Sequence, residues 1–360
     1  MRRYYLDNIR WATVLLVLIY HVCYLFNDVG VLGGVGSNKS VPAFNALSYF
    51  IYPWFMALLF VIAGISARYS MEKRSYKQFI KDRVTKLLIP STLGLFVYHW
   101  ITGYVNIKVG GGLDYIPASI RYPIFSISGV GPMWFIQMLF LFSLFIAFIH
   151  KMDKNDKIWN FCGKANFVMV LLLAFPIWGA AQILNMPVLT MYRFGIYFIA
   201  FLLGYFVLSH DNVQDSVEIK SIPLLISAVI LGVLYVIYYF GEDYTSPQCL
   251  QSFFTNIYLW IMTLTVLGCG KAWFHSNTRF FRYMTKSSFG LYVIHYPVVI
   301  TICYLLYYYC NMPAVMNYLV ALVMEIILTV ILFELFKRTP VIRYLVLGIK
   351  SEHIKKNCTT

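Results

Sequence analysis

Residues 1–21 read MRRYYLDNIRWATVLLVLIYH, an apolar segment that carries both Arg10 and His21. A central arginine costs roughly 2.5–3.5 kcal/mol in a membrane-inserted helix, so an ionisable residue in such a segment is a functional candidate. The two positions are eleven residues apart. At about 100° per residue, this spacing places both side chains on one helix face, roughly 16 Å apart along the axis.

The composition of the whole chain is that of a membrane protein, as this first segment suggests. Of the 360 residues, 60% are hydrophobic and only 12% are charged, which is too little charge for the surface of a soluble protein. Ten windows are long enough to cross about 30 Å of hydrocarbon. They fall near residues 6–26, 46–67, 87–105, 131–150, 166–185, 192–209, 221–240, 251–270, 287–309 and 314–336. We therefore expect an all-α polytopic membrane protein with about ten transmembrane helices.

The chain shows no long polar linker and no clear internal repeat. We expect one integral membrane domain over residues 1–345, followed by a basic cytoplasmic tail at 346–360. The first apolar run is too long for a cleaved signal peptide, so we expect it to be retained as a helix. Seven cysteines are scattered singly, which indicates neither a metal site nor a disulfide framework.

Basic residues in the loops predict the orientation. Of the 29 lysines and arginines, one is Arg10 and four fall in outer loops if the N-terminus is inside, which leaves 24 in inner segments. The outer four are Lys39, Lys108, Arg121 and Arg193. The positive-inside rule then places both termini in the cytoplasm. Topology and contact with anionic membrane lipid account for the net charge of +14, and no nucleic-acid partner is implied.

The face that carries Arg10 and His21 also carries Asp7, Tyr24 and Asp28. Such a stripe is costly against lipid, so it should line a protein interior or a wet cavity. Taken singly, Arg10 could snorkel to the headgroups and His21 could make an ordinary interhelical hydrogen bond. The shared face favours a functional site.

The chemistry of the two residues suggests group transfer. Histidine can take and return a proton near neutral pH. An arginine nearer the cytoplasm suits an anionic partner such as phosphate, because its guanidinium combines charge with directional donors. Acyl-CoA fits this description of a cytosolic, phosphate-bearing donor, as do other phosphorylated donors.

Four stretches, in order along the chain, resemble motifs of the acyltransferase-3 family of membrane proteins. LDNIRWATVLLVLIYH contains its Arg, ten residues, His signature, which Arg10 and His21 match. RVTKLLIP (83–90) resembles its RxxRLxxP run, with Lys86 where arginine is usual. GPMWFIQMLFLFS (131–143) resembles its P-x-W-F entry to a later span, and SSFGLYVIHYPVV (287–299) its S-x-G-(I/L)-Y-x-x-H-x-P segment, which supplies His295. The likeness extends over essentially the whole chain.

This resemblance implies a stand-alone, multi-pass acyltransferase of the cell (plasma or inner) membrane, without the extracytoplasmic hydrolase-like domain that some members add. His21 would be the general base, and Arg10 would hold the pantetheine or phosphate end of the donor. Arg68, Arg83 and Lys86 would take the nucleotide phosphates of acyl-CoA. Acetyl-CoA would be a substrate and no cofactor would be bound. The acceptor would be a hydroxyl of an exported glycan or a lipid-linked saccharide.

Other polar or aromatic residues in the apolar windows are candidates for the lining of the site. Trp134 could stack on a sugar ring or belong to the interfacial belt, and Gln137 lies close to it in sequence. His295 could be structural or part of the lining. Glu325 must be protonated or paired in mid-span, with His295 or Arg10 as candidate partners.

Two other functions remain open. A proton-coupled transporter or flippase of a glycan or lipid-linked precursor would also use intramembrane His, Glu and Arg, although the chain lacks a detectable repeat. A non-catalytic partner of a polysaccharide machine would need neither Arg10 nor His21. The sequence carries no signal for the oligomeric state.

Overall fold

The computed structural model describes residues 3–29, 33–36, 40–153, 155–186 and 191–350. Over these ranges the chain forms helices, and its β-structure is limited to an isolated bridge between Asn185 and Arg193. The prediction of an all-α polytopic membrane protein is confirmed. Arg2, Lys39, Lys154 and residues 351–360, which entered the charge count and the expected tail, lie outside the described residues.

The helices follow one another with short connections. The first half of the chain contains α1 (Tyr4–Leu25), α2 (Pro42–Ile51), α3 (Phe55–Met71), α4 (Tyr76–Arg83), α5 (Ile89–Gly94), α6 (Trp100–Val109), α7 (Arg121–Ser128) and α8 (Met133–Met152). The second half contains α9 (Lys157–Cys162), α10 (Phe167–Leu172), α11 (Ala174–Ala180), α12 (Phe194–Phe206), α13 (Asp211–Ile219), α14 (Ser221–Tyr239), α15 (Pro247–Gln251), α16 (Phe253–Trp273), α17 (Arg279–Tyr309), α18 (Ala314–Arg338) and α19 (Pro340–Leu347). Two π-helical turns, η1 (Val84–Leu88) and η2 (Leu95–His99), flank α5, and two 3-10 turns, η3 (Leu113–Tyr115) and η4 (Ala118–Ile120), precede α7.

Eight helical segments of the described chain are long and apolar enough to cross a membrane. The number rises to nine if α12 and α13, which meet at an angle of 106°, form one broken span. The remaining expected window, 166–185, contains an apolar helical stretch only over Phe167–Ala180, which is too short for about 30 Å of hydrocarbon. This stretch breaks between α10 and α11, where Pro176 cannot donate a helical hydrogen bond. The count of about ten is therefore reduced to eight or nine.

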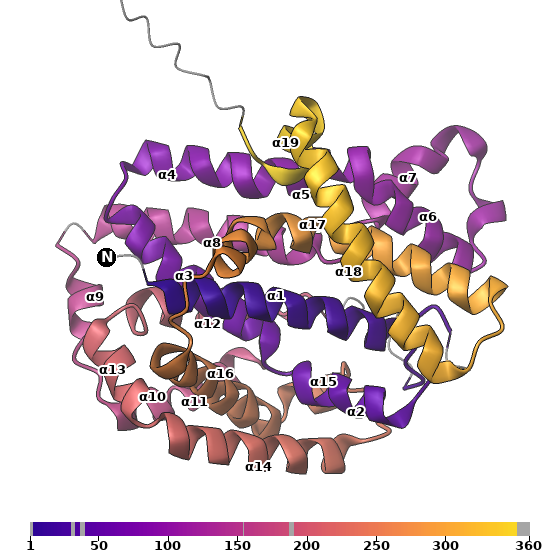
Figure 1. Cartoon of the computed structure of the whole chain (residues 1–360). Helices are drawn as coiled ribbons and strands as arrows, with labels where there is room; N and C mark the ends of the chain where they lie inside the picture. Colours follow the sequence, from indigo (N-terminus) through magenta and orange to yellow (C-terminus); the bar gives the residue numbers. More distant parts are fainter. Residues whose placement is uncertain (1–2, 30–32, 37–39, 154, 187–190, 351–360) are drawn as a thin grey trace, which may run out of the picture.

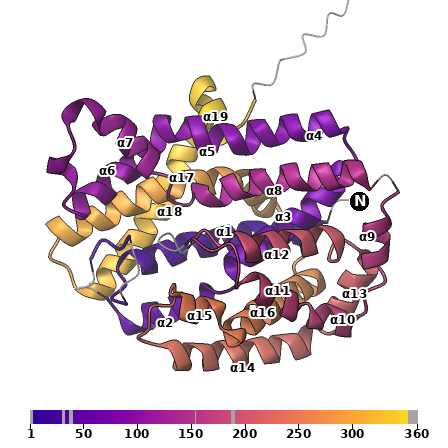
Figure 2. The same cartoon turned by 180° about the vertical axis from the view of Figure 1, so that it is seen from behind.

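The long helices lie side by side, with α1 at the centre of the array and the N-terminus at one end (Figure 1). Helix α1 contacts α2, α3, α16, α17 and α18. Seen from behind, α8 and α12 lie across the opposite face of the molecule (Figure 2). In its most apolar window, α1 is 67% buried, against 28% for α14 and 22% for α18. Helix α1 is therefore a core element, whereas α14 and α18 present their apolar residues to lipid.

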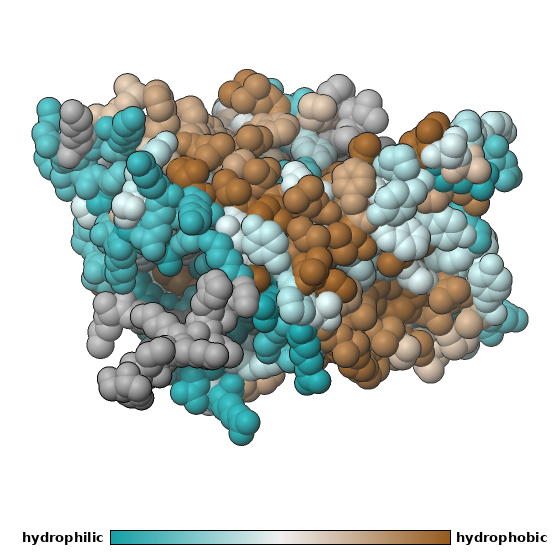
Figure 3. All heavy atoms as spheres, turned by 90° about the horizontal axis from the view of Figure 1, so that it is seen from above, coloured by the Kyte–Doolittle hydropathy of each residue, from teal (hydrophilic) through white to brown (hydrophobic). Residues whose placement is uncertain are grey.

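The start of α1 is held by polar contacts inside the protein. Asn8 is buried, and its amide donates to the carbonyl oxygens of Phe274 and Ser276 at 2.8 and 2.9 Å. Hydrophilic residues gather at one end of the molecule, and a hydrophobic band crosses its middle (Figure 3). If the basic end faces the cytoplasm, as the positive-inside rule predicts, α1 runs outward from the cytoplasmic side.

Candidate active site

The packing of α1 against α17 brings two histidines together. Nδ1 of His21 lies 3.2 Å from Nε2 of His295 and 2.9 Å from the carbonyl oxygen of Val17. His295 is fully buried, and its Nδ1 lies 2.6 Å from the carbonyl oxygen of Tyr292. The two motifs that supplied these histidines, far apart in sequence, therefore form one pair in the core.

The hydrogen bonds assign a tautomer to each neutral ring. A carbonyl oxygen can only accept, so Nδ1 of His295 carries the proton that bonds to Tyr292, and Nε2 of His295 is an acceptor. Nδ1 of His21 then carries a proton that points at both Val17 and His295. The assignment leaves Nε2 of His21 with a lone pair, which is the form that a general base requires.

A turn before α8 supports the histidine pair. The hydroxyl of Tyr292 donates to the carbonyl oxygen of Pro132 at 2.7 Å. Gly131 has φ of +43°, and a Cβ added there would lie 2.8 Å from the ring of Tyr296. That ring packs edge-on to His21, with 4.9 Å between the ring centroids. Two of the motifs quoted above, GPMWF and SSFGLYVIHYP, thus meet beside His21.

Arg10 lies nearer the N-terminal end of α1, on the wall shared by two cavities. Its Nη2 donates to Oγ of Ser66 at 2.6 Å, and its Nη1 lies 3.3 Å from a carboxylate oxygen of Asp7. Asp7 lines the smaller cavity, of about 450 Å³, and Arg10 and Ser66 line both. The guanidinium is thus held in place and remains accessible.

The larger cavity, of about 520 Å³, combines an apolar interior with a cationic rim. Val14, Leu59, Phe135 and Tyr292 contribute to the apolar part. The cationic residues of the lining are Arg10, Arg83, Lys86, Lys286 and Lys350, against a single carboxylate among the described lining residues, that of Asp82. Such a cavity suits a ligand with an apolar arm and several negative charges.

The structure places Arg10 in this cavity and the histidine pair next to it. His21 and His295 are absent from its described lining, but Tyr292, whose carbonyl oxygen accepts from His295, belongs to it. The shared helix face predicts that Arg10 and His21 line one common cavity. The described lining contains Arg10 without His21, and Tyr292 connects the lining to the histidine pair through its hydrogen bond with His295.

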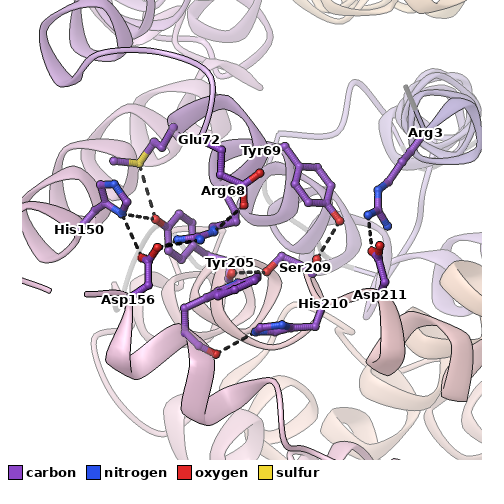
Figure 4. Close-up of polar contacts among 12 residues, drawn as sticks. Arg3, Arg68, Tyr69, Glu72, His150, Asp156, Tyr205, Ser209, His210 and Asp211 are labelled. Atoms are coloured by element: carbon purple, nitrogen blue, oxygen red, sulfur yellow. Dashed lines mark hydrogen bonds and ion pairs between the residues drawn. The ribbon is translucent and has the colours of Figure 1, made fainter. Parts of the chain in front are cut away.

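Arg68 does not join Arg83 and Lys86. Its guanidinium makes two hydrogen bonds to Asp156, at 2.7 and 3.0 Å, and one to Glu72 at 3.0 Å (Figure 4). It also lies over the ring of Trp159, 4.1 Å from the ring centroid, and its side chain is only 5% exposed. The hydrogen bonds from Arg68 lower the pKa of Asp156. Arg68 therefore joins α9 to the end of α3 and lies outside the described lining of the larger cavity.

Trp134 and Gln137 contact other residues of the protein interior. Trp134 is buried, with its ring 5.4 Å from that of Tyr197, so it belongs to an aromatic core cluster and not to the interfacial belt. Gln137 donates to the carbonyl oxygen of Ser91 at 2.9 Å, in the irregular helix around Pro90. Both contacts lie inside the protein.

Tyr24 of α1 and Glu325 of α18 are the last two candidates for the lining of the site. Tyr24 is buried, and its ring lies 6.2 Å from that of His21. Glu325 of α18 is fully buried, and its carboxylate oxygens have no hydrogen-bond partner among the described residues. The expected pairing with His295 or Arg10 is therefore not seen among the described residues.

Sequence reasoning missed Lys286, Lys350 and Ser66 as parts of the site. Lys286 was counted only as a loop charge, although it directly precedes the SSFGLY motif. The sequence predicts a tail from 346 on, whereas Leu347, Gly348 and Lys350 all line the larger cavity.

The fold and the site define an integral membrane protein with a histidine pair in its core beside a cationic cavity. Residues 3–334 match the family model described as "Acyltransferase domain", of the acyltransferase-3 type. This match covers nearly the whole chain, so the protein belongs to the acyltransferase-3 family and is a membrane acyltransferase. No curated protein and no solved structure matches the chain.

Proposed function

We propose that the protein transfers an acetyl group from cytosolic acetyl-CoA to a hydroxyl of an exported glycan or lipid-linked saccharide at the cell membrane. The observation that carries this proposal is the hydrogen-bond chain from Tyr292 through His295 to His21, beside a cationic cavity. The chain supplies an oriented base, and the cavity supplies a site for an anionic donor. Family membership favours this enzymatic function over the transporter and the assembly partner.

In this proposal, His21 acts as the general base. Its Nε2 removes the proton from the acceptor hydroxyl as that oxygen attacks the thioester carbonyl carbon. The new carbon–oxygen bond forms and the carbon–sulfur bond breaks. The proton then passes from Nε2 to the departing thiolate, so that the ester and free CoA are released and His21 is neutral again.

His295 is a positioning residue in this mechanism. Its Nε2 accepts the hydrogen bond from Nδ1 of His21 and so keeps the other nitrogen of His21 free of its proton. When His21 becomes an imidazolium, this hydrogen bond strengthens because the donor is then charged. The pair thus resembles a base with its orienting partner, although the partner is a neutral ring.

The larger cavity would hold the donor. Its apolar interior suits the pantetheine arm, while the guanidinium groups of Arg10 and Arg83 and the ammonium group of Lys86 suit phosphates. Arg68 is left out of this assignment because Asp156 and Glu72 already bind it. Lys86 offers charge without a bidentate fork, so it would contribute attraction more than geometry.

The test is mass spectrometry of surface glycans from cells that carry the gene, lack it, or carry His21→Ala. We expect acetylated glycan only with the intact gene, and equal membrane amounts of the variant and wild-type proteins. Acetylation that persists without the gene, or unchanged with His21→Ala, would contradict the proposal. A parallel assay in liposomes would detect movement of glycan without acetyl-CoA, which is the result that a transporter would give.

A further inference from the structure

The cations at the mouth of the larger cavity come from four separate parts of the chain. Arg10 belongs to α1, Arg83 and Lys86 to α4 and η1, Lys286 to α17, and Lys350 follows α19. Asp82, the carboxylate of the lining, is bound 3.0 Å from Nη1 of Arg74. It is therefore already paired with a cation outside this lining.

The cations fall into two tiers by exposure. Arg10 and Arg83 are half-buried, and the guanidinium of Arg83 lies over the ring of Phe79, 4.6 Å from its centroid. Lys86, Lys286 and Lys350 are exposed. The arginines thus lie deeper in the cavity and the lysines form its outer rim.

The three rim lysines line one cavity, and they lack the carboxylate partner that two other lysines of the inner segments have. Lys271 pairs with Asp215 and Glu218, and Lys337 pairs with Glu334. Among the described residues, Lys86, Lys286 and Lys350 have no carboxylate within ion-pair distance. Three unneutralised ammonium groups around one opening are electrostatically unfavourable without an anion between them.

The backbone fixes the rim in place. Gly348 ends α19 with φ of +62°, and a Cβ there would lie 2.6 Å from the carbonyl oxygen of Thr85 and 2.9 Å from Cα of Lys86. A Cβ at Gly94 would lie 2.8 Å from the carbonyl oxygen of Leu345. These close backbone approaches, which need glycine, seat α19 on η1 and α5 and bring Lys350 to Lys86.

We propose that Lys86, Lys286 and Lys350 form an outer phosphate subsite that takes the phosphate on the ribose of the donor nucleotide. Arg10 and Arg83 then face the diphosphate, which lies nearer the pantetheine arm. This inference rests on the proposed function, because it orders the phosphates by their distance from the thioester. A terminal, doubly charged phosphate suits several mobile point charges, whereas the inner diphosphate suits rigid guanidinium forks.

The test compares acetyl-CoA with acetyl-dephospho-CoA, which lacks only the ribose phosphate. The KM for each donor is measured at low salt with purified protein in nanodiscs. The variants are Lys286→Gln, Lys350→Gln and the double variant. Lys337→Gln is the control, because it removes a lysine charge outside the cavity. We expect the double variant to raise the KM for acetyl-CoA about tenfold, as the loss of two exposed charge contacts predicts. Its kcat, and its KM for acetyl-dephospho-CoA, should match those of the wild type.

An equal rise in KM for both donors would assign the lysines to the diphosphate or to general attraction and would overturn the subsite. Unchanged KM values in the double variant would overturn it as well.

If the wild type consumes no acetyl-CoA, the proposed function fails. A binding experiment then tests the subsite by itself. We expect adenosine 3′,5′-bisphosphate to bind the wild type more tightly than AMP, and this preference to disappear in the double variant. Equal binding of the two nucleotides by the wild type would refute the subsite.

Discussion

At the scale of single residues, the candidate site depends on two polar positions of α1. Arg10 and His21 stand out because ionisable groups are costly in an apolar helix. The partnership of His21 with His295 depends on the packing of α1 against α17, which no local pattern encodes. Arg68 was misplaced for a related reason: its partner Asp156 lies 88 positions away in the chain, so the pair is invisible to spacing.

The hydrogen bond between the histidines gives a prediction for His295. In His295→Gln, the side-chain carbonyl can still accept from Nδ1 of His21, so kcat should stay within about tenfold of wild type. In His295→Phe, the ring shape is kept but the acceptor is lost. We expect kcat to fall about 10²-fold there, with an unchanged KM for acetyl-CoA.

Steady-state turnover of both variants in nanodiscs measures this difference, with monodispersity checked first. A purely structural role for His295 would instead lower the amount of folded protein and leave kcat per folded molecule alike in the two variants. Equal activity of His295→Gln and His295→Phe would therefore remove His295 from the mechanism.

At the scale of helices, strongly apolar windows predicted most elements, and proline accounts for the main departures. Pro176 divides the window 166–185 into α10 and α11, and Pro90 lies in the short α5 between two π-helical turns. The α9 segment was not predicted, because it has only six residues and its position depends on a tertiary ion pair. That ion pair, Arg68 with Asp156, joins α9 to α3.

We predict that Asp156→Asn loosens this junction without affecting donor binding. The pKa of Asp156 is lowered by Arg68, so the carboxylate contributes stability above its unfolded-state pKa of about 3.9 and loses it as pH falls through the lower folded value. Because the side chain of Asp156 is 35% exposed, we expect a cost near neutral pH of only about 1 kcal/mol after solvent screening.

Thermal unfolding in detergent at several pH values measures this cost. The variant should unfold at a lower temperature than wild type near pH 7, and the two proteins should converge at acidic pH. The KM for acetyl-CoA should be unchanged, because Arg68 lies outside the cavity lining. A clear rise in KM would restore Arg68 to the donor site.

At the scale of the whole molecule, composition was sufficient to predict a membrane protein, since a chain with 60% hydrophobic residues cannot cover its surface with polar groups. The number of spans required the structure, because apolar windows do not reveal where helices break. The cavity also required it, since its rim is assembled from α1, α4, η1, α17 and the segment after α19. Residues so distant in sequence share no pattern that marks them as one site.

The charge asymmetry predicts the membrane orientation. We expect a fluorescent reporter fused after Lys350 to fold and fluoresce in the cytoplasm, and alkaline phosphatase fused at the same position to remain inactive. A fusion in the loop after α6, near Gly111, should give the opposite result. Active phosphatase at the C-terminal position would reverse the orientation and place the cationic cavity on the wrong side for cytosolic acetyl-CoA.

The central claim is that His21 is the base of an acetyl transfer. Its most direct test is the acetyl-CoA turnover of purified His21→Ala in nanodiscs, beside wild type and His275→Ala, which removes an exposed histidine away from the pair. General acid–base catalysis is typically worth ~10²–10⁴-fold, so we predict that His21→Ala loses at least about 10²-fold in turnover while His275→Ala retains wild-type activity. A folded, monodisperse His21→Ala protein with near wild-type turnover would contradict the account.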